Sequence, residues 1–171
     1  MADIFVEREF DPPLTRDDVL DMAAQSVGCF GIYKVEWIES FLSLDGRKMF
    51  CHFSTPDVES LRLAFRQSTG SVPLVIWSGS IHDSSGVLTA SVLVERSFVE
   101  PVLLDDIHAM EVANSWCLET RNVKHQRSFF ARDKKRMLCL YNAPDAQAVR
   151  EAQQQAGMPM DSAWAFDLIK P

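Results

Sequence analysis

The sequence predicts an α+β fold in which two tandem ferredoxin-like βαββαβ units pack sheet to sheet as a pseudo-dimeric α+β barrel. The first observation behind this prediction is an internal duplication. The chain matches itself when it is shifted by about 88 positions, beginning with Val6-Glu-Arg-Glu-Phe10 against Val94-Glu-Arg-Ser-Phe98. Because one register holds for roughly sixty residues, we expect two units, at 1–82 and 91–171, with a connector at 83–90.

The second observation is the order of the expected elements in the first copy. Runs of branched and aromatic residues predict four strands: Ile4–Phe10, Tyr33–Leu42, Lys48–Phe53 and Val72–Trp77. One helix is expected between a cap at Thr15 and an end at Gly28 and Gly31. Another is expected from Pro56 to Gly70. The resulting order, βαββαβ, is typical of a split βαβ unit.

The second copy repeats this order. Its expected strands are Ser91–Phe98, Asn122–Phe130, Arg136–Tyr141 and Asp161–Leu168. Its expected helices are Leu104–Cys117 and Asp145–Ala156. These strands are apolar on both sides, so we do not expect the sheet face that the helices leave open to meet water. Packing the two sheets face to face buries both open faces, and a pseudo-twofold axis then relates the copies.

Composition limits the function classes. The net charge of −7 argues against binding to nucleic acid or to an anionic membrane. No apolar run approaches the roughly 20 residues that span a bilayer, and no secretory signal is visible. The four cysteines form no C-x-x-C pair and are interpreted as small buried apolar residues. We therefore expect a cytoplasmic protein, either a monomer or a homodimer.

Common catalytic motifs are absent from the sequence. It contains no G-x-G-x-x-G after a strand, no H-E-x-x-H and no G-x-S-x-G. The remaining candidates are polar residues on buried strands. Glu7 and Glu95 alternate with Val6 and Val94, so if the valines face the helices, both glutamates point between the sheets.

Further candidates lie on the other strands. We expect His52 to share the face of Phe50, opposite Cys51. Trp37 and Glu39 are expected on one side of their strand, with His125 and Arg127 equivalent to them. The predicted ligand-binding residues are Glu7, Trp37, Glu39, Trp77, Glu95, Arg127 and Trp164, and the predicted metal ligands are His52 and His125.

Structural interpretations stand beside these predictions. The glutamates could form cross-strand ion pairs, and His52 could be a hydrogen-bonded interior histidine. Arg8 and Arg96, which point opposite to the glutamates, are expected to tie strand ends to the second helix of each copy. We expect these arginines to contact the second helices near Asp57 and Asp145.

Several motifs carry a family resemblance. Val94-Glu-Arg-Ser-Phe98, the run Cys139-Leu-Tyr-Asn-Ala-Pro-Asp-Ala-Gln-Ala-Val-Arg150 and a following Gly-Met-Pro resemble the small bacterial nickel-binding-protein-like family. The resemblance implies a dimeric α+β barrel that binds nickel or another divalent metal, with no established catalysis. Relatives often carry a histidine in the W-x-x-S-[FY] motif, where this chain has Glu39 and Arg127, and a guanidinium cannot ligate a metal.

Three functions remain open. The first is a non-catalytic binding protein that holds a metal ion or small ligand between its sheets. The second is an enzyme similar to cofactor-free monooxygenases of the same architecture, with His52 near Glu7 as a general base. The third is an interaction domain with no ligand. Since the fold hosts unrelated functions, we expect the binding protein first and catalysis last.

Overall fold

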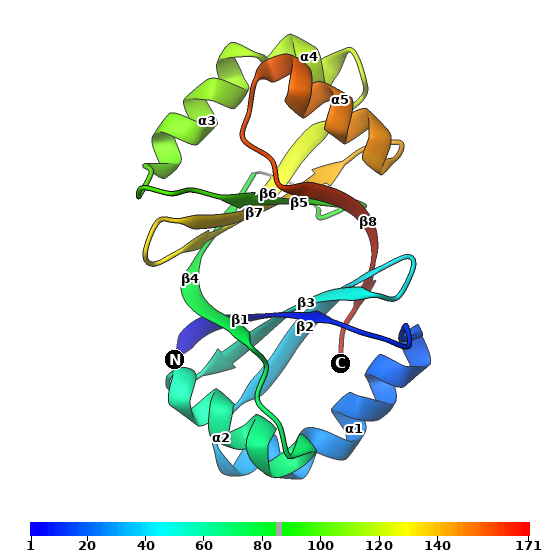
Figure 1. Ribbon diagram of the computed structural model, residues 1–171, viewed down its shortest axis with the longest axis vertical. Coiled ribbons are helices and arrows are strands. Elements are labelled where there is room, and N and C mark those ends of the chain that lie inside the picture. Colours follow the sequence, from blue (N-terminus) through cyan, green and yellow to red (C-terminus); the bar gives the residue numbers. More distant parts are fainter. Residues whose placement is uncertain (85–86) are drawn as a thin grey trace. The chain divides into compact units, whose positions relative to one another are not determined.

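The computed structural model describes residues 1–84 and 87–171, and its chain divides into two compact units (Figure 1). Unit 1 comprises Met1–Gly79 and Asp167–Pro171, and unit 2 comprises Ser80–Phe166. The connector expected at 83–90 includes residues 85–86, which lie outside the described residues. No described helix has the length and apolar character needed to cross a membrane.

Unit 1 is an antiparallel sheet with two helices on one face (Figure 1). Its elements are β1 (Ala2–Glu9), α1 (Arg16–Ile32), β2 (Glu36–Ser43), β3 (Lys48–Thr55), α2 (Val58–Thr69) and the first part of β4 (Val75–Asp83). The strands follow the hydrogen-bonded order β4-β1-β3-β2. The register places Val6 opposite Cys51 and Phe5 opposite His52.

Unit 2 repeats the arrangement. Its elements are β5 (Val92–Ser97), α3 (Leu104–Ala113), α4 (Ser115–Glu119), β6 (Lys124–Ala131), β7 (Arg136–Asn142), α5 (Ala146–Ala156) and most of β8 (Ser162–Ile169). The strands follow the order β8-β5-β7-β6, and Val94 lies opposite Cys139 as Val6 lies opposite Cys51. The predicted α+β class with two tandem βαββαβ units is confirmed.

Two strands contain residues of both units. Residues 75–79 of β4 belong to unit 1 and 80–83 to unit 2, while 162–166 of β8 belong to unit 2 and 167–169 to unit 1. The strand order therefore closes on itself as β1-β3-β2-β8-β5-β7-β6-β4, as expected of an α+β barrel.

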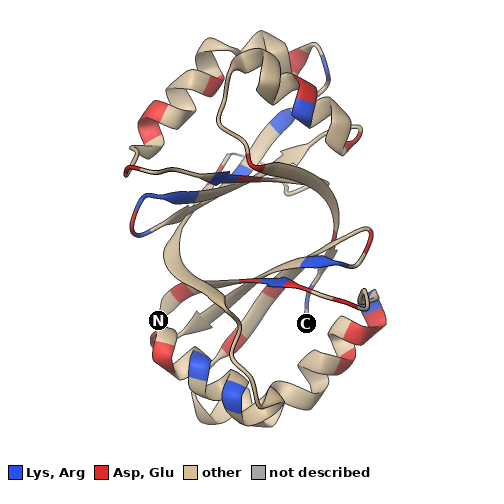
Figure 2. Cartoon of the chain, in the orientation of Figure 1, with Lys and Arg blue, Asp and Glu red and all other residues tan. Residues whose placement is uncertain are grey.

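The helix ends are determined by local chemistry. Thr15 and Asp18 form a capping box at the start of α1. The equivalent residues Asp57 and Asp145 cap α2 and α5, and each accepts a backbone N–H three residues later at 2.7 Å. Acidic pairs occupy the first turns of α1 and α3, where they complement the helix dipole (Figure 2).

Several element boundaries differ from the prediction. Gly28 and Gly31 do not end α1, which continues to Ile32 before Lys34 adopts a positive φ of 56°. The helix expected over Leu104–Cys117 is interrupted at Asn114, whose side-chain amide donates to the carbonyl oxygen of Met110 at 2.9 Å and competes with the helical pattern. The last strand of unit 1 begins at Val75, three residues later than expected.

Each unit has its own core between helices and sheet. In unit 1 the strand residues Val6 and Cys51 pack with Leu61 and Phe65 of α2. In unit 2 the equivalent Val94 and Cys139 belong to the same cluster as Val149 and Ala152 of α5. The valines therefore face the helices, and the neighbouring glutamates point to the other face of each sheet.

Candidate functional site

A β-bulge in β2 separates two of the predicted site residues. Trp37 pairs with Phe53 and Glu39 pairs with His52, so Ile38 is an extra residue between them. Trp37 consequently faces the helices and packs on the core of unit 1, whereas Glu39 lies on the opposite face. The expectation that Trp37 and Glu39 share one side of the strand was wrong, because simple alternation does not hold across a bulge.

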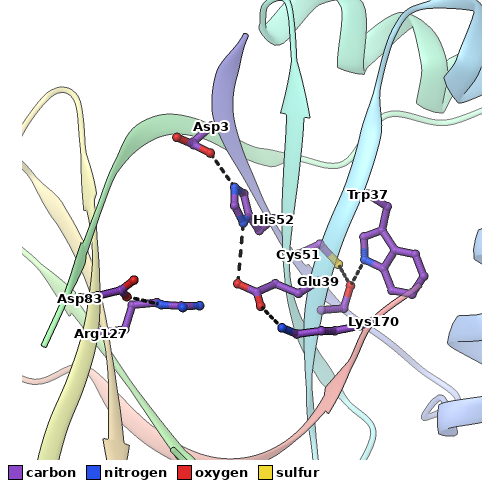
Figure 3. Close-up of polar contacts among 9 residues, drawn as sticks. Asp3, Trp37, Glu39, Cys51, His52, Asp83, Arg127 and Lys170 are labelled. Carbon is purple, nitrogen blue, oxygen red and sulfur yellow. Dashed lines mark hydrogen bonds and ion pairs between the residues drawn. The ribbon is translucent and has the colours of Figure 1, made fainter. Parts of the chain in front are cut away.

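The open face of the unit 1 sheet carries a chain of charged residues (Figure 3). His52 is 5% exposed, and its Nε2 lies 2.8 Å from Asp3 Oδ1. On the other side of the ring, Nδ1 lies 3.7 Å from Glu39 Oε1. The second oxygen of Glu39 lies 3.7 Å from Lys170 Nζ. The imidazole of His52 is thus held between two carboxylates of its own unit.

Glu7 and Glu95 each accept a hydrogen bond from a tryptophan of the same unit. Trp77 Nε1 donates to Glu7 Oε2 at 2.7 Å. In unit 2, Trp164 Nε1 donates to Glu95 Oε2 at 3.2 Å, and Ser162 also donates to this oxygen. A glutamate and a tryptophan therefore form a repeated hydrogen-bonded pair, one in each unit.

His125 occupies the position of Trp37 and makes the equivalent contact. Trp37 Nε1 donates to Ser40 Oγ at 2.9 Å, and His125 Nε2 lies 2.7 Å from Ser128 Oγ. The other ring nitrogen of His125 lies 3.0 Å from Ser84 Oγ. Burial lowers the pKa of His125, so the ring is neutral at pH 7.

The second bulge separates His125 from Arg127 in the same way. Arg127 Nε donates to Asp83 Oδ1 at 2.5 Å (Figure 3). The guanidinium lies 6.0 Å from the ring centre of Phe129. Arg127 therefore stands where Glu39 stands in unit 1 and contributes a fixed positive charge.

The donor set does not fit a nickel site. Among the described residues, no group of three or more His, Cys, Asp or Glu side chains is placed to hold a metal ion. The two nitrogens of His52 face carboxylates on opposite sides, and the ammonium of Lys170 lies beside Glu39. In unit 2, both nitrogens of His125 contact serine hydroxyls, and Arg127 offers no lone pair.

Unit 1 has a cavity that sequence reasoning missed. It has a volume of about 610 Å³ and lies between α1 and the helix-facing side of the sheet. Its walls are mainly apolar, and the middle of α1 faces it with the small side chains of Ala23 and Ser26. Trp37 is the one predicted site residue that lines the cavity. Arg8, which was not among the predicted site residues, also lines it.

Arg8 is the positively charged residue of this cavity. Its guanidinium carbon lies 4.9 Å from the ring centre of Phe10 and 5.6 Å from that of Phe65. Burial lowers the pKa of Arg8, although a guanidinium stays protonated at any physiological pH. Arg8 therefore reaches α2, as predicted, but through an aromatic ring. Asp57, the expected partner, caps the helix.

The equivalent Arg96 in unit 2 is enclosed by polar groups. It is 1% exposed and donates to Tyr141 Oη at 2.8 Å, to Gln153 Oε1 at 2.8 Å and to the carbonyl oxygen of Pro159 at 2.5 Å. Tyr141 in turn donates to Glu111 Oε2 at 2.7 Å. Arg96 therefore reaches α5 through Gln153, and not through Asp145, which caps that helix.

Aligning the two copies shows how the surroundings of Arg8 and Arg96 differ. In the register of the repeat, Phe53 stands for Tyr141, Phe65 for Gln153 and Ala23 for Glu111. Each of the three polar side chains around Arg96 is thus replaced by an apolar side chain around Arg8. This difference was present in the sequence as a signal, but only the structure shows that the three positions surround one arginine.

Comparison with known proteins places the chain in a family. The model of the family described as Nickel responsive protein SCO4226-like matches residues 5–78 and 93–165. This chain belongs to that family. The resemblance found in the sequence is confirmed, and the two matched segments correspond to the two copies.

Solved structures show a likeness in fold. SCO4226 from Streptomyces coelicolor A3(2) is 20% identical and matches 43% of this chain and 91% of its own, with a TM-score of 0.39. A candidate chlorite dismutase, TA0507, is 10% identical over 99% of this chain and 96% of its own, with a TM-score of 0.52. An anthrone oxidase-like protein is 9% identical over 98% and 92%, also with a TM-score of 0.52. No curated protein matches the sequence.

Proposed function

We propose that this chain is a non-catalytic binding protein that holds a small organic ligand in the cavity of unit 1. The observation that carries the proposal is the cavity itself, about 610 Å³ between α1 and the sheet. Ligand sites are typically concave, mostly apolar and furnished with a few polar groups. The cavity has this character, because its apolar walls include one guanidinium, that of Arg8.

Nickel is the ligand that the family description suggests, and His52 and His125 are the residues predicted to hold it. Their surroundings argue against that role in this chain. His52 lies between Asp3 and Glu39, and His125 lies between two serine hydroxyls. We therefore assign the ligand to the cavity and treat the two histidines as structural.

The cavity groups favour binding over catalysis. Burial raises the pKa of the Cys51 thiol to about 11, so this thiol is protonated at neutral pH and is a poor nucleophile. Arg8 keeps its proton and cannot act as a base. Glu36 also borders the cavity but is exposed to solvent. His52, the candidate base of the monooxygenase-like alternative, lies on the other face of the sheet.

A neutral apolar probe tests the binding role. N-phenyl-1-naphthylamine should bind the protein with increased fluorescence, and Ala23→Phe, which fills the cavity, should weaken that binding about tenfold or more, since it denies the probe its apolar contacts. Ala109→Phe, at an exposed position of α3, is the matched control and should bind as the original protein does. Equal binding by the original protein and the Ala23→Phe variant would contradict the proposal.

Two further measurements separate the alternatives. Ser26→Leu fills the same space from another position of α1 and should give the same loss if Ala23→Phe does not fold. Calorimetric titration with nickel should show no stoichiometric uptake, and His52→Ala should not change that result. Mass spectrometry of the recovered probe should show an unchanged mass, whereas a monooxygenase would add oxygen to it.

A further inference from the structure

The chemical class of the ligand follows from the difference between the two arginines and rests on the binding role proposed above. We propose that the cavity of unit 1 takes an apolar molecule with a single carboxylate, and that Arg8 binds this carboxylate.

Arg8 is a cation that forms no ion pair among the described residues. Within the part of the chain that the structure describes, none of the ion pairs includes Arg8, and its guanidinium lies over the rings of Phe10 and Phe65. Removing a guanidinium from water is costly unless a partner with the opposite charge replaces the solvent. The cavity thus holds a cation that a bound anion would stabilise.

Unit 2 shows how the same fold gives the terminal nitrogens of this arginine internal hydrogen-bond partners. Tyr141 and Gln153 accept hydrogen bonds from Arg96, and Glu111 lies next in the chain of contacts through Tyr141. The equivalents in unit 1 are Phe53, Phe65 and Ala23, which accept no hydrogen bond with their side chains. Since Ala23 replaces a glutamate, unit 1 lacks both a negative charge and the volume of that side chain at this position.

The apolar walls define the rest of the ligand. Phe30, Met49 and Trp37 line the cavity and are buried or half-buried. Because these side chains are apolar, they would contact a hydrocarbon chain or an aromatic ring, and among the described residues that line the cavity only Arg8 is positively charged. A volume of about 610 Å³ also falls in the range of about 300–1,000 Å³ that small-molecule sites occupy. A planar guanidinium binds a carboxylate through two parallel hydrogen bonds, which favours this anion at the polar end.

The test compares an acid with its neutral counterpart. Decanoate and decanamide have nearly the same shape but differ in charge at pH 7.5. Isothermal titration of the full chain should give decanoate an affinity about tenfold or more above that of decanamide, as expected for a charge-assisted pair of hydrogen bonds. This comparison needs no variant, so it decides the ligand class even if a substitution prevents folding.

Two variants identify Arg8 as the origin of the preference. Arg8→Gln should bring the two affinities together by weakening only decanoate. Ala23→Glu restores the carboxylate found in unit 2 and should weaken decanoate by about tenfold or more, because an internal anion then competes for the guanidinium. Arg62→Gln removes a more exposed arginine of α2 and should leave the ratio unchanged.

The outcomes distinguish the two proposals. A preference for decanoate that Arg8→Gln abolishes supports the assignment. Equal affinities in the original protein overturn the carboxylate class and leave the binding role in place. Failure of decanoate, decanamide and the naphthylamine probe to bind overturns both proposals. A preference that survives Arg8→Gln assigns the anion to another residue and overturns the role of Arg8.

Discussion

At the scale of single residues, Tyr141 connects a buried cation to a carboxylate. Its hydroxyl accepts a hydrogen bond from Arg96 and donates one to Glu111, in surroundings where Tyr141 is fully buried. Burial raises the pKa of this phenol well above its ordinary value of about 10, and the positive charge of Arg96 offsets only part of this increase. The network gives both terminal nitrogens of the Arg96 guanidinium internal hydrogen-bond partners, so unit 2 has less demand for an external anion than Arg8 creates in unit 1.

Tyr141→Phe should lower the free energy of unfolding by about 2 kcal/mol, because the guanidinium of Arg96 and the carboxylate of Glu111 each lose a partner in a buried position. Urea denaturation at pH 7 measures this change. Tyr33→Phe is the control, since Tyr33 is only half-buried, and should cost less than about 0.5 kcal/mol. An equal cost for both substitutions would contradict the stabilising role of the network.

The stability cost of Tyr141→Phe should depend on pH. The neutral phenol is favoured in the folded state, so its contribution to stability is complete below the unfolded pKa of about 10 and is lost as pH rises from there towards the folded value. The stability difference between the original protein and Tyr141→Phe should therefore shrink above about pH 10. Urea titrations at a series of alkaline pH values check the sign.

Residue roles of this kind were only partly predictable. The alternation of Val6 with Glu7 predicted correctly which side chains face the helices. The partners of Arg8 and Arg96 were not predictable, because they lie on strands, helices and connecting segments that come together only in the folded unit. The three apolar replacements around Arg8 became meaningful only when the structure brought those positions together.

At the scale of elements, caps and bulges show where sequence patterns succeed and fail. Thr15, Asp57 and Asp145 mark helix starts through short-range hydrogen bonds, so a sequence pattern identifies them. The bulges at Ile38 and Gln126 depend on cross-strand register, which no local pattern specifies. The predicted site therefore placed Trp37 and His125 on the wrong face of their strands.

The side chain of Asp145, which caps α5, should stabilise the folded protein. Asp145→Ala removes the acceptor for the backbone N–H of Ala148 and should lower the free energy of unfolding by about 1 kcal/mol. Asp145→Asn keeps a side-chain oxygen at the cap and should retain most of the stability. Thermal and urea unfolding of the two variants provide the comparison, and an equal loss in both would indicate that the carboxylate charge matters more than the cap.

At the scale of the whole molecule, the strands β4 and β8 each contain residues of both units. Ile169 is fully buried and belongs to the core of unit 1, although it lies in the second copy of the repeat along the chain. The upstream residues of the same strand pair with β5 in unit 2. The duplication predicted two units, but it gave no sign that β4 and β8 contribute to both.

Sharing these strands should couple the unfolding of the two units. Ile169→Ala removes a buried side chain from unit 1 and should cost about 2–5 kcal/mol. Because β8 continues into unit 2, we expect both units to lose stability together. Hydrogen-exchange mass spectrometry in increasing urea follows peptides of each unit separately. Val99→Ala, at a position that is 89% exposed, is the control. A loss confined to unit 1 peptides would mean that the two units unfold independently despite their shared strands.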